Sequence, residues 1–258
     1  MPVPLDLNAL TALLATEGFV AATEEAAELI ARAAGDVELL GSLVERRLTG
    51  EPLAWITGSI SFCGVDVLVH PGVYVPRWQT EPLARRAAQL LPAKGMAIDL
   101  CTGAGAIAKT LATAHPDARV VASDLDTHAV ACAAANGVEA YCGDLFAPLP
   151  HALGGRTDVV VSVVPYVPTS ALSLLPRDTF TFESPLSYDG GTDGTEILRR
   201  VLSGSPYFLR AGGALLLELG GDQAGALDED LDRLGFVDRT VLVDEDGDVR
   251  GIEATLGG

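Results

Sequence analysis

The amino-acid sequence predicts an α/β protein: a doubly wound, mostly parallel sheet with a terminal antiparallel strand, preceded by a small helical domain. Three observations predict this fold class. From residue 97 onward, short apolar runs alternate with helical stretches, the pattern of a parallel sheet covered on both faces. The first apolar run leads into a glycine turn and a helix, the opening unit of such a sheet. The last two apolar runs, 236–243 and 249–256, are joined by a turn too short for a helical crossover, so the last strand must be antiparallel.

Composition and charge exclude several classes of protein. The chain has 258 residues, of which 48% are hydrophobic and 20% charged, so it can bury a substantial core. Its net charge of −18 disfavours a nucleic-acid or membrane partner, and no stretch of ~18 apolar residues predicts a membrane span. The four cysteines and four histidines show no metal-ligand spacing, so no metal site is predicted. Free thiols and the lack of a basic leader favour a cytoplasmic location.

Residues 1–50 are expected to form a small helical domain that recognises the substrate. A second helix is expected to open at Thr23, a good N-cap, and to end at Gly35. A third helix follows at 39–48, and no catalytic constellation occurs in this part of the chain. The apolar stripe of the first helix consists of Leu7, Leu10, Leu13 and Leu14.

Residues 51–92 are expected to form a hairpin linker and a connecting helix. The Gly-Glu-Pro sequence at 50–52 interrupts the helical region. Between Trp55 and Val75, β-prone residues are interrupted by glycines, which is typical of a hairpin. The segment at 76–82 then leads into a helix that ends near Leu91.

Residues 93–258 are expected to hold the sheet. The predicted parallel strands are 97–100, 119–123, 138–141, 158–163 and 214–219. The predicted helices between and after them are 106–114, 127–135, 195–209 and 222–234.

The turn at 101–108 is the central feature of this predicted sheet. Gly103 and Gly105 allow a sharp turn and a close approach of a ligand to the backbone. The helix behind them begins with unpaired N–H groups that can bind a ligand oxygen. The same pattern also fits the dinucleotide fingerprint of nicotinamide enzymes, so the turn alone leaves the nucleotide open. The antiparallel ending differs from the all-parallel sheet of those dehydrogenases and resembles the class I methyltransferases that use S-adenosylmethionine.

Three acidic residues lie at the ends of successive predicted strands, at the edge where open α/β sheets bind ligands. Asp99 ends the first strand. Asp124 ends the second and can accept hydrogen bonds from both ribose hydroxyls. Asp144 follows the third and can accept from an adenine amino group. Each acid alone is also typical of a cap or a turn, but three in succession favour a nucleotide site.

The sequence after the fourth strand resembles a family. An Asp/Asn-Pro-Pro-Tyr motif at this place marks methyltransferases that act on planar nitrogens, and the chain has Val-Val-Pro-Tyr at 163–166. The flanking motifs are similar to those of the HemK/PrmC family, which methylates the glutamine side-chain amide of peptide chain release factors. The matching segments are 50–58, Pro76-Arg77 with Thr80-Glu81, 99–108, 183–186, 189–194, and Glu218-Leu219-Gly220 with Gln223.

This resemblance implies S-adenosyl-L-methionine as cofactor and identifies candidate residues for each role. It implies an acceptor site at Val163, Val164, Pro165 and Tyr166. The residues it assigns to cofactor binding are Asp99, Cys101, Thr102, Gly103, Gly105, Asp124, Leu125, Gly143, Asp144 and Leu145.

Two positions depart from the family pattern. Cys101 replaces the first turn glycine, which is a minor change. Val163 replaces the motif Asn, whose side chain in the family holds the target amide together with the carbonyl of the next residue. Val163 cannot accept a hydrogen bond, and losing one preorganised contact typically costs ~10²–10³ in rate. Three interpretations therefore remain open: a release-factor glutamine as acceptor, a small molecule as acceptor, or a silent homologue. The long segment at 167–192 is expected to be a lid or binding loop.

Overall fold

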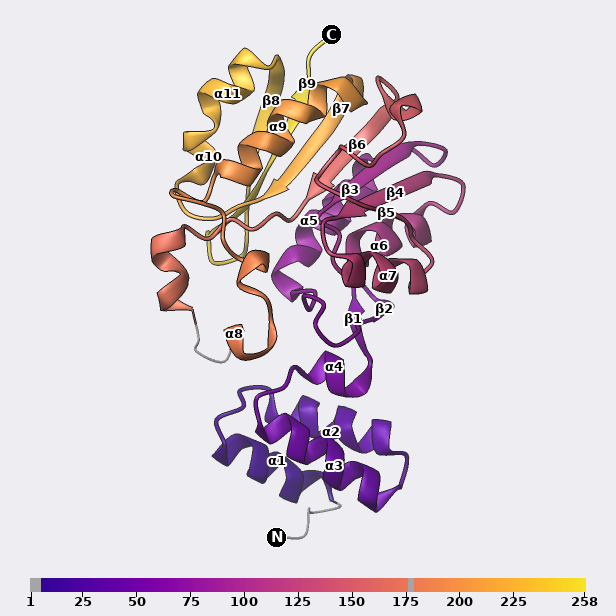
Figure 1. The fold of residues 1–258 in the computed structure, drawn as a ribbon, viewed down its shortest axis with the longest axis vertical. Coiled ribbons are helices and arrows are strands. Elements are labelled where there is room, and N and C mark those ends of the chain that lie inside the picture. The colour runs from indigo at the N-terminus through magenta and orange to yellow at the C-terminus, as the bar shows by residue number, and fades with distance from the viewer. Residues whose placement is uncertain (1–5, 176–178) are drawn as a thin grey trace. The chain divides into compact units, whose positions relative to one another are not determined.

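The computed structural model describes residues 6–175 and 179–258 of the chain. The chain divides into two compact units, one up to Ile60 and one from Ser61 onward. The first unit contains helices, and the second contains the large sheet (Figure 1).

In its described part, from residue 6 onward, the first unit is a bundle of four helices. Its core is formed by fully or nearly fully buried aliphatic side chains from every helix, among them Leu10, Leu29, Val44 and Ile56. The short fourth helix belongs to this core, so the unit extends ten residues beyond position 50. The helices are α1 (Leu7–Thr16), α2 (Ala22–Ala33), α3 (Val37–Leu48) and α4 (Leu53–Thr57).

Two local predictions in this region were wrong. Helix α2 begins one residue before Thr23, with Ala21 as an N-cap that makes no side-chain bond. Thr23 therefore lies inside the first turn, where its hydroxyl cannot cap the helix. Trp55 was expected in a hairpin but is buried in α4, and the hairpin begins four residues later.

A two-stranded hairpin and a helix lead into the sheet. Strands β1 (Ser59–Phe62) and β2 (Val65–Leu68) pair with each other. The connecting residues Cys63 and Gly64 both have positive φ, 52° and 78°, as a tight hairpin turn requires. A single 3₁₀ turn, η1 (Trp78–Thr80), then precedes helix α5 (Glu81–Leu90), which ends where it was predicted to end.

The main sheet has seven strands in the order β5-β4-β3-β6-β7-β9-β8 (Figure 1). Strands β3 to β7 pair in parallel, whereas β9 lies between β7 and β8 and is antiparallel to both. The predicted fold class and the antiparallel last strand are therefore confirmed. The strands are β3 (Met96–Leu100), β4 (Arg119–Asp124), β5 (Glu139–Cys142), β6 (Thr157–Ser162), β7 (Leu209–Glu218), β8 (Phe236–Val243) and β9 (Val249–Leu256).

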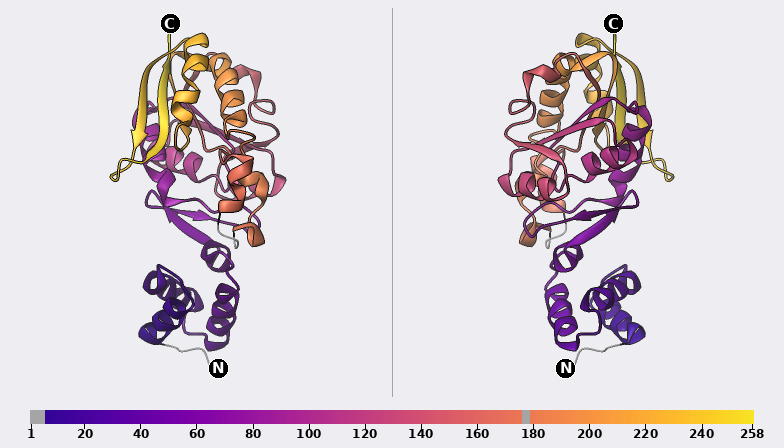
Figure 2. Two further views of the ribbon diagram at one scale, coloured as in Figure 1. Left: turned by 90° about the vertical axis from the view of Figure 1, so that its left-hand side faces the viewer. Right: turned by 90° about the vertical axis from the view of Figure 1, so that its right-hand side faces the viewer.

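Helices cover both faces of this sheet (Figure 2). Helix α5 contacts α6, and α7 contacts β4 and β5. Helix α9 packs against β6 and β7, and α11 packs against β8. The central strands are buried on both sides, which accounts for their continuous apolar sequences. The helices are α6 (Ala106–Ala114), α7 (Thr127–Ala135), α9 (Glu196–Phe208), α10 (Gln223–Ala226) and α11 (Asp228–Arg233).

Two segments differ from their predicted form. The helix expected at 222–234 is divided into α10 and α11, with the fully buried Leu227 between them. The segment at 167–192 contains η3 (Thr169–Leu174), α8 (Thr179–Phe182) and η4 (Pro185–Ser187). Among the helices of residues 6–175 and 179–258, none combines the length and the apolar character needed to span a membrane.

Candidate active site

Strands β3, β4 and β5 end at one edge of the sheet and present the residues predicted to bind the cofactor. In the parallel register, Leu100 of β3 is opposite Ser123 of β4, and Asp124 is opposite Cys142 of β5. The amide of Gly143 donates to the carbonyl of Asp124 at 2.9 Å, so this ladder continues beyond the last paired residues. The three acids predicted at strand ends are therefore neighbours in space.

The glycine turn after β3 has the conformation that its sequence indicates. Gly103 and Gly105 have φ of 55° and 81°, and Gly105 is the N-cap of α6. A Cβ on Gly105 would lie 3.0 Å from Ala133 of α7, so this glycine also lets two helices pack closely. Cys101 has φ of 56°, in the left-handed region that favours glycine. Cysteine at this position stores backbone strain of about 1–3 kcal/mol.

Asp99 is a buried carboxylate that holds the turn together. Only 1% of the residue is exposed, and Oδ2 accepts hydrogen bonds from the Thr102 hydroxyl at 2.6 Å and from the Ala108 amide at 3.1 Å. Burial raises the pKa of Asp99 to about 7, although both hydrogen bonds act in the opposite direction. The side chain thus connects the end of β3 to the first turn of α6 and shapes the ligand-facing backbone.

Asp124 is positioned at the rim of the same turn. Its Oδ2 accepts from the Gly103 amide at 2.8 Å and its Oδ1 from the Asp126 amide at 3.0 Å. Burial raises its pKa, and the hydrogen bonds from Asp126 and Gly103 oppose this. Each carboxylate oxygen retains a lone pair that can accept from a ribose hydroxyl. The next residue, Leu125, is 70% exposed and offers an apolar surface beside the carboxylate.

Asp144 and Leu145 have different surroundings. The Asp144 side chain is 51% exposed, and its Oδ2 pairs with Nη2 of Arg200 from α9 at 2.5 Å. Leu145 is buried in the core with φ of 48°, and its carbonyl accepts from the Ser123 hydroxyl at 2.6 Å. The pairing with Arg200 was not predicted, because no local pattern connects α9 to the end of β5.

The predicted acceptor turn, residues 163–166, follows β6, which lies beside β3 in the sheet. Val164 is buried in the core, whereas Val163, Pro165 and Tyr166 are half-buried. The Tyr166 hydroxyl donates to Oε1 of Glu218 at 3.1 Å, and Oε2 of Glu218 accepts from the Thr80 hydroxyl at 2.6 Å. Burial raises the pKa of Glu218, and both hydrogen bonds lower it.

A second polar cluster joins the segment after β2 to the long loop. The buried Glu183 accepts from the Val75 amide at 3.0 Å and from Arg77 Nη2 at 2.5 Å, and the Tyr188 hydroxyl also donates to it. The Arg77 guanidinium lies 4.9 Å from the centre of the Tyr74 ring. The family resemblance predicted that Arg77 and Glu183 belong to motifs, but their pairing became visible only in the structure.

Metal-binding groups do not gather at this site. Within residues 6–175 and 179–258, no three His, Cys, Asp or Glu side chains come together in a way that could hold a metal ion. The free cysteines Cys63, Cys101, Cys132 and Cys142 are dispersed over the second unit.

Known proteins are similar to this chain in sequence and in fold. Residues 65–153 match the family model of the methyltransferase small domain. The release factor glutamine methyltransferase of Geobacter sulfurreducens is 35% identical over 221 residues, which cover 83% of this chain and 77% of that protein. That of Moorella thermoacetica is 39% identical over 194 residues, covering 71% and 67%.

A solved structure agrees in fold. The E. cuniculi Mtq2–Trm112 complex, described as responsible for methylation of the eRF1 translation termination factor, matches with a TM-score of 0.53 and 22% identity, covering 72% of this chain and 99% of that chain. On the evidence of its relatives and its fold, the chain belongs to the release factor glutamine methyltransferase family and is an S-adenosylmethionine-dependent methyltransferase.

Proposed function

We propose that S-adenosylmethionine binds across the ends of β3, β4 and β5 and that the methyl acceptor is held at the turn after β6. The sheet order supports this proposal, because β3, β4 and β5 are neighbours and β6 lies directly beside β3. The chain's residues also fit the cofactor. Gly103 leaves its outer side open, since a Cβ there would meet nothing closer than the Tyr74 carbonyl at 4.0 Å. Asp124 suits the ribose, and the exposed Leu125 suits the face of the adenine.

The bound cofactor would supply an electrophilic methyl group on a sulfonium sulfur. The task of the chain is to align a nucleophile with that group, since well-oriented reactants need little further assistance. Tyr166 can pack against a planar group, because Glu218 fixes its hydroxyl. The Val164 carbonyl can accept from the N–H of the nucleophile.

The first candidate acceptor is the glutamine side chain of a peptide chain release factor. Its support is the name that the relatives carry, at 35% and 39% identity. Such an acceptor implies a cytoplasmic protein, and the net charge of −18 argues against a nucleic-acid acceptor. We further propose that the N-terminal helical unit recognises this partner, as the family resemblance implies.

The second candidate is a small molecule with an amine or hydroxyl nucleophile. The half-buried Val163 favours it, because an apolar side chain stands where the family positions its amide acceptor. An amide nitrogen is a poor nucleophile and depends strongly on orientation. An amine or hydroxyl tolerates the loss of one contact better.

The deciding experiment supplies methyl-labelled S-adenosylmethionine to the purified protein together with a release factor and with a low-molecular-mass extract. Label in the release factor supports the first candidate, and label in a small molecule supports the second. At a low cofactor concentration the Asp124→Ala variant should transfer less label, whereas Asp117→Asn, which changes an exposed carboxylate before β4, should not. A protein that transfers no label to either fraction would refute the proposed function.

A further inference from the structure

Gln223, at the start of α10, holds the backbone of the acceptor turn. Its Nε2 donates to the Tyr166 carbonyl at 2.7 Å and reaches the Asp193 carbonyl at 3.5 Å. Its Oε1 accepts from the Gly220 amide at 3.0 Å. The carboxamide therefore joins the turn after β6 to the turn after β7. The hydroxyl of the same tyrosine is held by Glu218, the last residue of β7.

Two glycines allow the segment at 189–194 to lie directly against this turn. A Cβ on Gly194 would be 2.2 Å from the Tyr166 carbonyl oxygen and 2.4 Å from Nε2 of Gln223. A Cβ on Gly190 would be 2.7 Å from the Tyr166 Cα. Side chains at these positions would displace either the turn or the amide that holds it. This contact gives a physical reason for the glycines in the Asp-Gly-Gly-Thr-Asp-Gly motif.

A cavity of about 450 Å³ lies beside the turn on the side of Gln223. The residues that line it include Tyr166, Asp193, Thr195, Asp222 and Gln223. Part of the turn therefore borders open space, and there the Gln223 amide supplies the hydrogen bond to the Tyr166 carbonyl.

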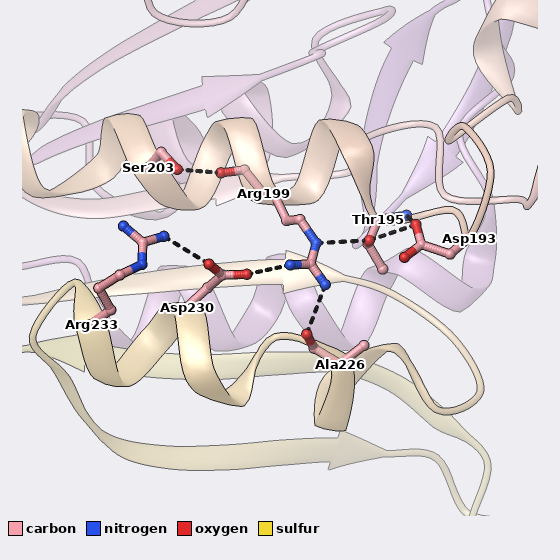
Figure 3. Close-up of polar contacts among 7 residues, drawn as sticks. All are labelled: Asp193, Thr195, Arg199, Ser203, Ala226, Asp230 and Arg233. Atoms are coloured by element: carbon pink, nitrogen blue, oxygen red, sulfur yellow. Dashed lines mark hydrogen bonds and ion pairs between the residues drawn. The ribbon is translucent and has the colours of Figure 1, made fainter.

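The elements that carry Gln223 and Asp193 are themselves tied together through Arg199 of α9. Its guanidinium donates to the Thr195 hydroxyl at 3.0 Å, to the Ala226 carbonyl at 2.9 Å and to Asp230 at 2.5 Å. Figure 3 shows these contacts. Thr195 in turn donates to the Asp193 carboxylate at 2.6 Å. Helix α10 is thus anchored to α9 and α11, so Gln223 projects from a fixed support.

We propose that Gln223 is a positioning residue for methyl transfer, acting through Tyr166. Together with Glu218 it holds the tyrosine at both its carbonyl and its hydroxyl, so that the Val164 carbonyl and the tyrosine ring keep the orientation that an acceptor needs. This inference rests on the proposed function, because it assumes that the acceptor lies at residues 163–166.

The test compares Gln223→Glu and Gln223→Ala with Asp222→Asn, a neighbouring change at the same cavity that removes no bond to Tyr166. We expect kcat to fall on the order of 10–100-fold in both Gln223 variants, the scale of a small misplacement, with the affinity for S-adenosylhomocysteine unchanged. A carboxylate at 223 faces the Tyr166 carbonyl without a proton, but a protonated carboxyl can donate to it. The activity of Gln223→Glu relative to wild type should therefore rise as pH falls from 8 to 5, while that of Gln223→Ala stays constant.

Asp193 and Asp222 line the cavity, and Glu218 binds the tyrosine hydroxyl, so all three carboxylates face this region. They are present in wild type and in both Gln223 variants. Dividing the activity of each variant by that of wild type at the same pH therefore removes the effect of their titration. Hydrogen–deuterium exchange of the peptide containing Tyr166 and Val167 provides a readout independent of activity, and it should accelerate in Gln223→Ala. A pH-independent activity ratio for Gln223→Glu, or unchanged exchange in Gln223→Ala, would overturn the role of Gln223. A wild-type protein that transfers no methyl group would instead overturn the proposed function.

Discussion

The free energy of unfolding should fall between pH 5 and pH 8, and the fall should be much smaller in the Asp99→Asn variant. The pKa of Asp99 is raised from 3.8 to about 7 because the carboxyl is buried. The folded protein therefore binds this proton more tightly than the unfolded chain does. The resulting stabilisation is fully present below pH 3.8 and disappears as the pH rises through about 7. Asparagine does not titrate, and its carbonyl can still accept from Thr102 and Ala108.

The size of this stabilisation at a given pH follows from the difference between that pH and the pKa of Asp99 in the folded state. At pH 5 the unfolded carboxyl is ionised, while the folded one holds its proton with a pKa of about 7. At about 1.4 kcal/mol per unit, two units correspond to about 3 kcal/mol. At pH 8 the contribution is close to zero. Asp124 and Glu218 also have pKa values raised by burial, but both are present in wild type and variant.

Urea unfolding at pH 5, 6, 7 and 8 measures this difference. The free energy of unfolding of wild type should fall by about 3 kcal/mol more than that of Asp99→Asn over this range. Asp117→Asn, at an exposed site, serves as the control and should follow the wild-type curve. Parallel curves for wild type and Asp99→Asn would refute the argument that burial keeps this carboxyl protonated at mildly acidic pH.

Three more predictions address the reaction. If a release-factor glutamine is the acceptor, Val163→Asn should raise the rate on it by up to ~10²–10³, whereas with a small-molecule acceptor the same change should lower the rate on that molecule; the labelling assay with both acceptors measures which occurs. Asp124→Ala should weaken S-adenosylmethionine binding at least tenfold, the effect of losing about one charged hydrogen bond; equal affinities by calorimetry would show that this carboxylate does not bind the ribose. A chain beginning at Gly58 should bind the cofactor normally but lose transfer to a release factor; full transfer would exclude the helical unit from recognition.

Local sequence patterns predicted the backbone of the second unit well. The helices at 106–114 and 127–135 and both terminal strands were predicted with their observed bounds, and the glycine turn adopts the expected positive φ. These features depend on residues that are near one another in the chain. The failure at Thr23 has a different cause: α2 starts one residue earlier, where Ala22 is buried, and this packing overrides the capping preference of threonine.

The polar contacts that hold the acceptor turn were beyond sequence reasoning. Gln223 and Tyr166 are 57 positions apart, and Thr80 and Glu218 are 138 apart. Motif resemblance identified Gln223 and Glu218 as positions of interest, but a motif does not name the partner of a side chain. The residue-level assignments of the cofactor and acceptor sites stay predictions until the experiments above are done.

The insertion of β9 between β7 and β8 has a consequence for synthesis of the chain. Until β9 emerges from the ribosome, β7 has an exposed edge with unpaired backbone groups, and an open edge invites pairing with other chains. Glu218 lies at the end of β7, opposite Gly251 of β9. The strand that carries Glu218, the partner of the Tyr166 hydroxyl, therefore completes its pairing only after β9 has been synthesised.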